Sequence, residues 1–219
     1  MRVFLIHGMA RTRLSMAVLA GRLWRAGHRP SLFGYSVQRH TLEHIVERFA
    51  DRIEEVMAAA PGAPYAVVGH SLGNVITRLA SPRLPPGFAR FVMLAPPNQP
   101  PALARALGGN PIFRLAFGDA GDKLKDDGFF ARIPVPEVPS LIIAGTRGPR
   151  ASWLPFGGAA NDAILRLEET RLGDLPLVTV HAAHTFLMNR REVFVLVRDF
   201  LDRGLEAPSI RRRLTAHRS

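Results

Sequence analysis

The chain has 219 residues, of which 47% are hydrophobic, so it can bury the core of one domain. It contains no cysteine, which excludes disulfides, a thiolate nucleophile and cysteine-based metal sites and leaves oxygen and imidazole groups for any chemistry. The formal net charge of +11 comes mostly from scattered arginines rather than from a clustered patch, so we expect no nucleic-acid partner.

Short apolar runs alternate along the chain with longer stretches of helical period. This pattern predicts an α/β fold, a doubly wound and mainly parallel sheet of about six strands with helices on both faces. The runs are continuously apolar, as suits strands buried on both faces. The predicted strands are residues 2–6, 30–34, 65–68, 88–94, 140–144 and 177–180. The predicted helices are residues 15–26, 41–60, 74–80 and 192–203.

Two stretches break this alternation. Residues 96–138, an insert after the fourth predicted strand, are rich in Pro, Gly and apolar side chains and contain no convincing strand. We expect short helices there, either packed on the sheet or forming a mobile lid over the site. The second stretch, residues 146–161, contains Trp153 and Phe156, and we expect a loop at the mouth of the pocket.

The ends of the chain predict its domain limits and its location. Residues 1–204 are expected to form a single domain, followed by a basic tail of residues 205–219 that includes Arg211, Arg212, Arg213 and Arg218. Such an end is typically solvated and partly disordered, and at most it would weakly contact an anionic membrane. The apolar run at residues 3–6 is too short for a signal core, and no run approaches the ~18 residues of a spanning helix, so a cytoplasmic protein is expected.

The most informative segment surrounds Ser71. The third predicted strand ends in Gly69-His70-Ser71-Leu72-Gly73, and a helical pattern follows it. This is the form of a nucleophile elbow, in which a serine occupies a sharp strand-to-helix turn and the two glycines leave room for that turn. The pentapeptide alone is common, but its position between a strand and a helix favours Ser71 as a nucleophile.

A nucleophilic serine requires a base and a group that orients the base, both on loops after later strands. His184 follows the last predicted strand and is the preferred base, ahead of His181 at the strand end itself. For the acid we choose Asp162, with Glu168 as the next candidate. Glu169 belongs to the same charged face as Glu168, and Asp174 is typical of a turn before a strand.

Stabilising an oxyanion requires backbone N–H donors. The N–H of Leu72 comes with the elbow, and we expect the second from Met9 in the loop after the first strand. His7 in that loop is expected to be structural. We expect no metal and no cofactor, because nucleotide-binding and zinc-protease motifs do not occur in the sequence.

Together these motifs resemble the α/β-hydrolase superfamily, and in particular its small lipase and esterase branch. The resemblance is carried by residues 3–8 and 69–73, Asn161-Asp162 and His184, and the segment from Gly145 to His184 is also similar to bacterial relatives of GPI-inositol deacylases. It implies a triad of Ser71, Asp162 and His184 with oxyanion donors at Met9 and Leu72. It also implies hydrolysis of a small-molecule acyl ester, with lipid-like esters among the candidates.

Other functions remain open at this point. The same residues could cleave a thioester or an amide, and acyl-CoA substrates would give the arginines a role. A protein of this fold could also hold a ligand without catalysis. The sequence does not choose among these alternatives, and it does not predict the oligomeric state.

Overall fold

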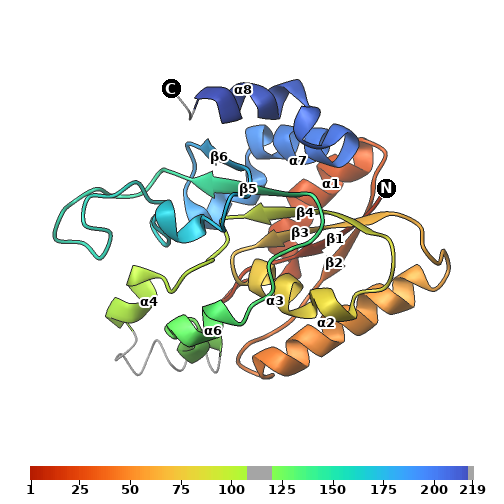
Figure 1. Ribbon diagram of the computed structural model, residues 1–219, viewed down its shortest axis with the longest axis horizontal. Helices are drawn as coiled ribbons and strands as arrows, with labels where there is room; N and C mark the ends of the chain where they lie inside the picture. Colours follow the sequence, from red (N-terminus) through yellow and green to blue (C-terminus); the bar gives the residue numbers. More distant parts are fainter. Residues whose placement is uncertain (108–119, 217–219) are drawn as a thin grey trace.

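The computed structural model describes residues 1–107 and 120–216. Its centre is one sheet in which each neighbouring pair of strands is parallel, in the order β2-β1-β3-β4-β5-β6 (Figure 1). The strands are β1 (Arg2–Ile6), β2 (Arg29–Phe33), β3 (Tyr65–His70), β4 (Phe88–Leu94), β5 (Ser140–Gly145) and β6 (Leu177–Val180). The predicted α/β fold is confirmed.

The α-helices are α1 (Ala17–Arg25), α2 (Leu42–Met57), α3 (Leu72–Ala80), α4 (Ala102–Leu107), α6 (Asp127–Ala131), α7 (Arg191–Arg203) and α8 (Pro208–Ala216). The 3₁₀-helices are η1 (Arg13–Met16), η2 (Ser81–Arg83), η3 (Glu168–Thr170), η4 (His184–Asn189) and η5 (Gly204–Glu206). Within the described part of the chain, none of the helices is both long and apolar enough to cross a bilayer.

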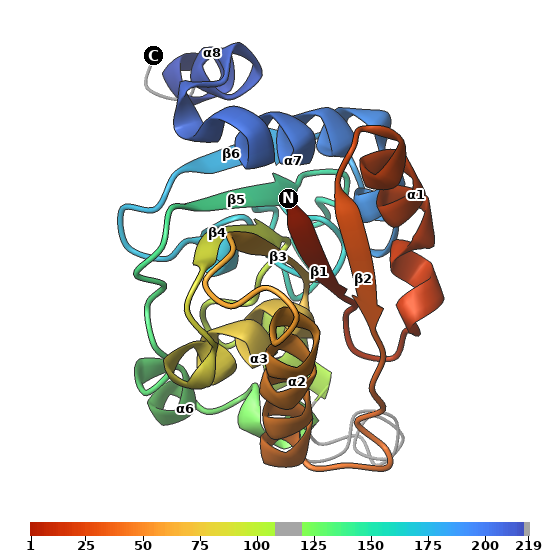
Figure 2. The same ribbon diagram turned by 90° about the vertical axis from the view of Figure 1, so that its right-hand side faces the viewer.

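The helices cover the two faces of the sheet, with α1 and α7 on one side and α2 and α3 on the other (Figures 1 and 2). Strand β1 shows why both faces must be covered: Val3 and Leu5 belong to one apolar core and Phe4 and Ile6 to the other. Successive side chains of a strand point to opposite faces, so a continuous apolar run requires a layer on each side.

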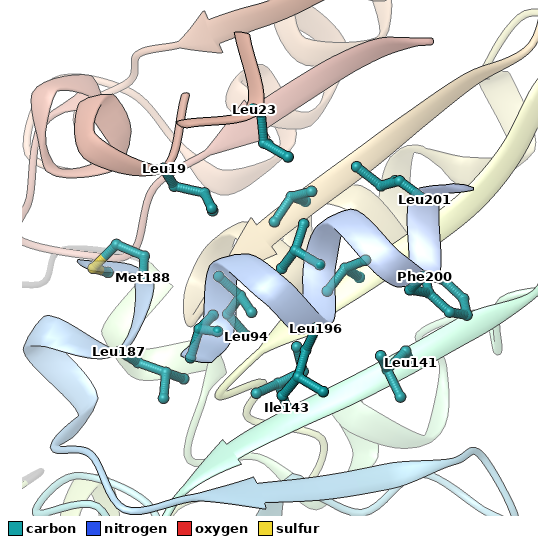
Figure 3. Packing of buried hydrophobic residues seen from close by; sticks show 14 of the residues in the cluster. Leu19, Leu23, Leu94, Leu141, Ile143, Leu187, Met188, Leu196, Phe200 and Leu201 are labelled. Atoms are coloured by element: carbon teal, nitrogen blue, oxygen red, sulfur yellow. The ribbon is translucent and has the colours of Figure 1, made fainter. Parts of the chain in front are cut away.

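Helix α7 illustrates the packing on one face. Its buried side chains Leu196, Phe200 and Leu201 lie between Leu19 and Leu23 of α1 and side chains of β4 and β5 (Figure 3). Burying an aliphatic or aromatic side chain of this size stabilises a fold by about 1.5–3 kcal/mol. The apolar face of α7 therefore fixes the last helix, and with it the loop before α7, against the sheet.

The insert between β4 and β5 contains short helices, as expected, including α4 and α6 in its described parts. Both lie on the α3 side of the sheet (Figure 1). Residues 108–119, which include the apolar side chains Ile112, Phe113, Leu115 and Phe117 of this insert, lie outside the described residues. Whether the insert is a mobile lid stays a prediction.

The end of the chain differs from the disordered tail that its charge predicts. Residues 208–216 form α8, which packs on α7, and Ile210 is completely buried (Figure 1). Arg213 also donates a hydrogen bond of 2.9 Å to the carbonyl oxygen of Thr179 in β6. The apolar residues Ile210 and Leu214 are four positions apart and share one helix face. Because the three residues between them are all arginines, the composition of this segment does not indicate a buried helix face. Arg218 lies outside the described residues.

Removing the buried side chain of α8 tests this packing. The substitution Ile210→Ala is expected to lower the free energy of unfolding by about 2–5 kcal/mol, because it leaves a cavity between α8 and the core. The matched control Arg211→Ala removes an exposed neighbour and is expected to stay within about 0.5 kcal/mol of wild type. Urea unfolding measures both, and equal small effects would mean that α8 is not anchored.

Candidate active site

Ser71 lies at the turn between β3 and α3 with φ 51° and ψ −122°. This is a strained conformation for a residue other than glycine. A side chain on Gly69 would collide with the side chain of Asn74, and a Cβ on Gly73 would lie 2.7 Å from the carbonyl oxygen of Ile6. Glycine is therefore required at both positions, as the elbow motif predicts.

Hydrogen bonds from the neighbouring strand hold this turn in place. The N–H of Ser71 donates to the carbonyl oxygen of Leu94 at the end of β4, with a distance of 2.9 Å. The buried side chain of Asn74 donates to the carbonyl oxygens of Ser71 and Leu94, at 3.0 and 3.1 Å. The strand-to-helix turn is thus tied to β4, and sequence reasoning did not identify Asn74 because its partner in β4, Leu94, lies 20 residues away.

His184 and Asp162 come together after β6 and β5. Nδ1 of His184 lies 2.7 Å from Oδ2 of Asp162, and the two residues are only 6% and 1% exposed. A carboxylate at this distance requires Nδ1 to carry the proton, which leaves Nε2 as the acceptor nitrogen of a neutral ring. The N–H of His184 also donates to the carbonyl oxygen of Asp162, at 2.9 Å, so the two residues are joined through their main chains as well as through their side chains.

The carboxylate of Asp162 is fixed by its own turn. Its Oδ1 accepts hydrogen bonds from the N–H groups of Ile164 and Leu165, at 3.0 and 2.8 Å. The preceding Asn161 is fully buried, and its side chain donates to Pro149 and Ala159 and accepts from Ala163. These bonds leave Oδ2 of Asp162 directed to the imidazole.

The alternative acids and base lie elsewhere. Glu168 is exposed in η3 and pairs with Arg166 at 3.3 Å. Asp174 and His181 are also exposed. Glu169 is buried and accepts hydrogen bonds from the N–H groups of Ala102 and Arg166, so it supports the base of the insert. Burial raises the pKa of Glu169, and these bonds partly offset the effect.

Ser71 and His184 line the same cavity, which has a volume of about 250 Å³. Most of its wall is apolar. The insert and the turn after Asp162 contribute Pro97, Pro101, Leu103, Ala104, Leu124, Ile164 and Leu165. The loop of residues 146–161 was predicted to form the mouth, but it contributes none of the described lining residues, and Trp153 in this loop is 84% exposed. Part of the insert, rather than this loop, therefore borders the site.

The two residues predicted to donate to the oxyanion, Leu72 and Met9, both lie near Ser71. Leu72 is the first residue of α3, so its N–H has no partner within the helix. The loop after β1 comes close to the serine, because a Cβ on Gly8 would lie 2.9 Å from the Cβ of Ser71, and Met9 of this loop lines the cavity. The role of these two amides as oxyanion donors stays a prediction.

His7 is structural, as its position in this loop suggests. Its Nδ1 lies 2.7 Å from the carbonyl oxygen of Gly8, and its Nε2 accepts a bond of 3.2 Å from the N–H of Tyr35. The ring stacks on Tyr35 at 4.2 Å, and burial lowers the pKa of His7. Both nitrogens are therefore occupied in a neutral ring, which leaves no free nitrogen to act as a second base.

His70 is a site residue that sequence reasoning missed. It is 1% exposed, it lines the cavity, and its Nε2 lies 3.1 Å from the carbonyl oxygen of His184. A carbonyl can only accept, so Nε2 carries the proton. Burial lowers the pKa of His70 well below its usual value, and the nearby His184 adds to the effect. His70 therefore supports the backbone of His184 as a neutral ring.

The buried, neutral state of His70 predicts an acid-sensitive fold. In the unfolded chain a histidine gains its proton near pH 6.5, whereas buried His70 resists protonation, so the free energy of unfolding should fall as pH drops below about 6.5. In His70→Gln this loss should be smaller. Urea unfolding between neutral and mildly acidic pH measures it, and the same pH dependence in both proteins would contradict this account.

A second prediction concerns the glycine after the serine. Gly73→Ala would press a methyl group against the carbonyl oxygens of Ile6 and His7, so we expect a loss of about 1–3 kcal/mol in the free energy of unfolding. Gly21→Ala is the matched control, because this position is open and lies inside α1. It should gain about 0.5–1 kcal/mol. A neutral effect of Gly73→Ala would argue against the close packing of the elbow.

An elbow serine beside a His–Asp pair above a parallel sheet is the arrangement found in hydrolases of the α/β class. The comparison with protein families agrees: residues 3–216 match the alpha/beta hydrolase family, so the chain belongs to it. No curated protein matches this sequence.

Solved structures share this fold. The mature lipase BlEst2 of Bacillus licheniformis aligns with a TM-score of 0.71 and 16% identity over 92% of this chain and 90% of the lipase. Phospholipase PlaB of Legionella pneumophila aligns with a TM-score of 0.72 and 15% identity. The alignment covers 99% of this chain but only 61% of the phospholipase chain. An extracellular alpha/beta-hydrolase from a Paenibacillus species aligns with a TM-score of 0.56 and 17% identity, over 94% of this chain and 98% of the hydrolase. At these identities the likeness establishes the fold alone.

Proposed function

We propose that the protein is a serine hydrolase of carboxylic esters that works through an acyl-Ser71 intermediate. The single observation that carries this proposal is that His184, which lies 2.7 Å from Asp162, lines the same cavity as Ser71. A base of fixed tautomer and orientation beside a strained serine is what activation of a hydroxyl requires.

In the proposed reaction, Nε2 of His184 takes the proton of the Ser71 hydroxyl as its oxygen attacks the ester carbonyl carbon. The oxyanion accepts hydrogen bonds from the N–H groups of Leu72 and Met9. The alcohol then leaves with the proton from His184, and Ser71 carries the acyl group. Water, deprotonated by His184, releases the acid and restores the serine. Asp162 stabilises the imidazolium that forms twice in this cycle.

The lining of the cavity supports an acyl substrate. Apolar side chains of the insert and of the turn after Asp162 surround the serine, and an acyl chain would gain about 0.8 kcal/mol for each methylene group that it buries there. The volume of about 250 Å³ lies just below the range of about 300–1,000 Å³ that is usual for drug-sized ligands, so an acyl chain of short or medium length fits better than a long one.

The test is hydrolysis of nitrophenyl butyrate by variants of the proposed triad. Ser71→Ala should abolish turnover, and Asp162→Asn should lower kcat by about 10³–10⁴-fold, because the imidazole loses its tautomer and orientation. Glu168→Gln is the matched control, since this acid is exposed and does not contact His184, and it should keep wild-type activity.

Labelling by a fluorophosphonate separates a hydrolase from a protein that only binds a ligand. An activated serine reacts with the probe, so the wild type should be labelled at Ser71 and Ser71→Ala should not. Full hydrolysis by Ser71→Ala, or loss of activity in Glu168→Gln equal to that in Asp162→Asn, would contradict the proposed roles.

A further inference from the structure

A second cavity, of about 410 Å³, adjoins the one at Ser71. The two share Ala10 and Arg11 in the loop after β1, so both border this loop and Arg11 contributes to each. The chemical character changes at this boundary. The first cavity is mainly apolar, whereas the second is lined by polar side chains that include Thr12, Ser36 and Arg39.

The charge of the second cavity is entirely positive. Arg11 and Arg39 line it, and none of the described residues that line it is acidic; the first 42 residues of the chain contain no Asp or Glu at all. Neither arginine forms an ion pair with any described residue. By contrast, Arg83 and Arg105 elsewhere on the surface lie next to carboxylates. Two guanidinium groups without counter-charges favour an anionic ligand.

Arg11 also lies close to the reacting groups. Its positive charge contributes, after burial, to the lowered pKa of His7 and of His70. An anion held by Arg11 would therefore lie beside the loop that carries Met9 and beside the histidine that supports His184.

The two loops that form the second cavity are fixed to each other. The hydroxyl of Tyr35, which follows β2, donates to the carbonyl oxygen of His7 at 2.9 Å, and the N–H of Tyr35 donates to the ring of His7 at 3.2 Å. The loop with Arg39 is thus held in register with the loop that borders Ser71. Loops that are already fixed to each other lower the entropy cost of binding a ligand between them.

We propose that Arg11 and Arg39 bind a phosphate group of the substrate, so that the protein cleaves acyl esters or thioesters whose alcohol or thiol portion carries a phosphate. This inference rests on the proposed hydrolase function. Phosphate offers a charge near −2 and several acceptor oxygens, which match two guanidinium groups and neighbouring hydroxyls. The acyl chain occupies the apolar cavity, and the phosphate remains on the alcohol or thiol that leaves with the proton from His184.

Binding of monooctyl phosphate tests the site without relying on catalysis. It combines an alkyl chain with a phosphate, and calorimetry should show that it binds the full-length protein at least tenfold more tightly than octanol does. Arg11→Gln and Arg39→Gln should each weaken this binding about tenfold, because each removes a charged hydrogen-bond donor. Arg29→Gln is the control. Arg29 is exposed and lies at the start of β2, at the opposite edge of the sheet, so its loss should leave the affinity unchanged.

Turnover then identifies the source of the phosphate. Octanoyl-CoA is compared with octanoyl-N-acetylcysteamine, and 1-octanoylglycerol 3-phosphate with 1-octanoylglycerol. A higher kcat/KM for the phosphate member of either pair supports the site and names its substrate class. In Arg39→Gln the ratio of the two kcat/KM values should fall about tenfold, and in Arg29→Gln it should not change.

Two results would overturn the inference. One is equal affinity for octyl phosphate and octanol, and the other is an equal loss in Arg29→Gln and Arg39→Gln, which would mean diffuse surface charge rather than a site. If octyl phosphate binds as expected but neither ester nor thioester is cleaved, the phosphate site stands and the hydrolase proposal fails.

Discussion

The backbone of Ser71 has positive φ, in a region that costs a non-glycine residue about 1–3 kcal/mol, and the rest of the site is arranged around this turn. The strain persists because neighbouring strands fix the turn on both sides. The carbonyl oxygen of Leu94 in β4 accepts from Ser71 and Asn74, while the carbonyl oxygens of Ile6 and His7 lie against Gly73. Because β3 lies between β1 and β4, the sheet order itself supplies these constraints.

The order and direction of the strands also explain how residues far apart in the sequence come together at the site. All six strands are parallel, so the loops after β1, β3, β5 and β6 open at one edge of the sheet. Met9, Ser71, Asp162 and His184 follow these strands. The apolar layers on both faces fix the strands, and thereby the distance between groups that lie up to 175 residues apart in the sequence. The polar bonds at this edge, such as His70 to the carbonyl oxygen of His184, then set the fine alignment.

The fold could be predicted because its signals are local. Continuous apolar runs such as residues 65–68 predict buried strands, and the glycines around Ser71 predict its turn within ten residues of sequence. Helix ends were less accurate, since the helix expected at 41–60 ends at Met57 and the one expected at 15–26 begins as a 3₁₀-helix. Local patterns do not fix the point at which a helix frays.

What the sequence did not predict depends on tertiary contacts. Helix α8 was taken for a tail, because its anchor is one stripe of Ile210 and Leu214 among arginines. Asn74 and His70 were missed, since each bonds a backbone group far away in the sequence. The second cavity brings together Arg11 and Arg39 from loops after different strands, and only their proximity in space groups these two positive charges.

The most direct test of the central claim is the crystal structure of the protein after reaction with a fluorophosphonate. The account predicts phosphorus bonded to Oγ of Ser71, a phosphoryl oxygen within hydrogen-bond distance of the N–H groups of Leu72 and Met9, and Nε2 of His184 facing Oγ. A probe attached to another residue, or a phosphoryl oxygen directed away from both amides, would contradict it.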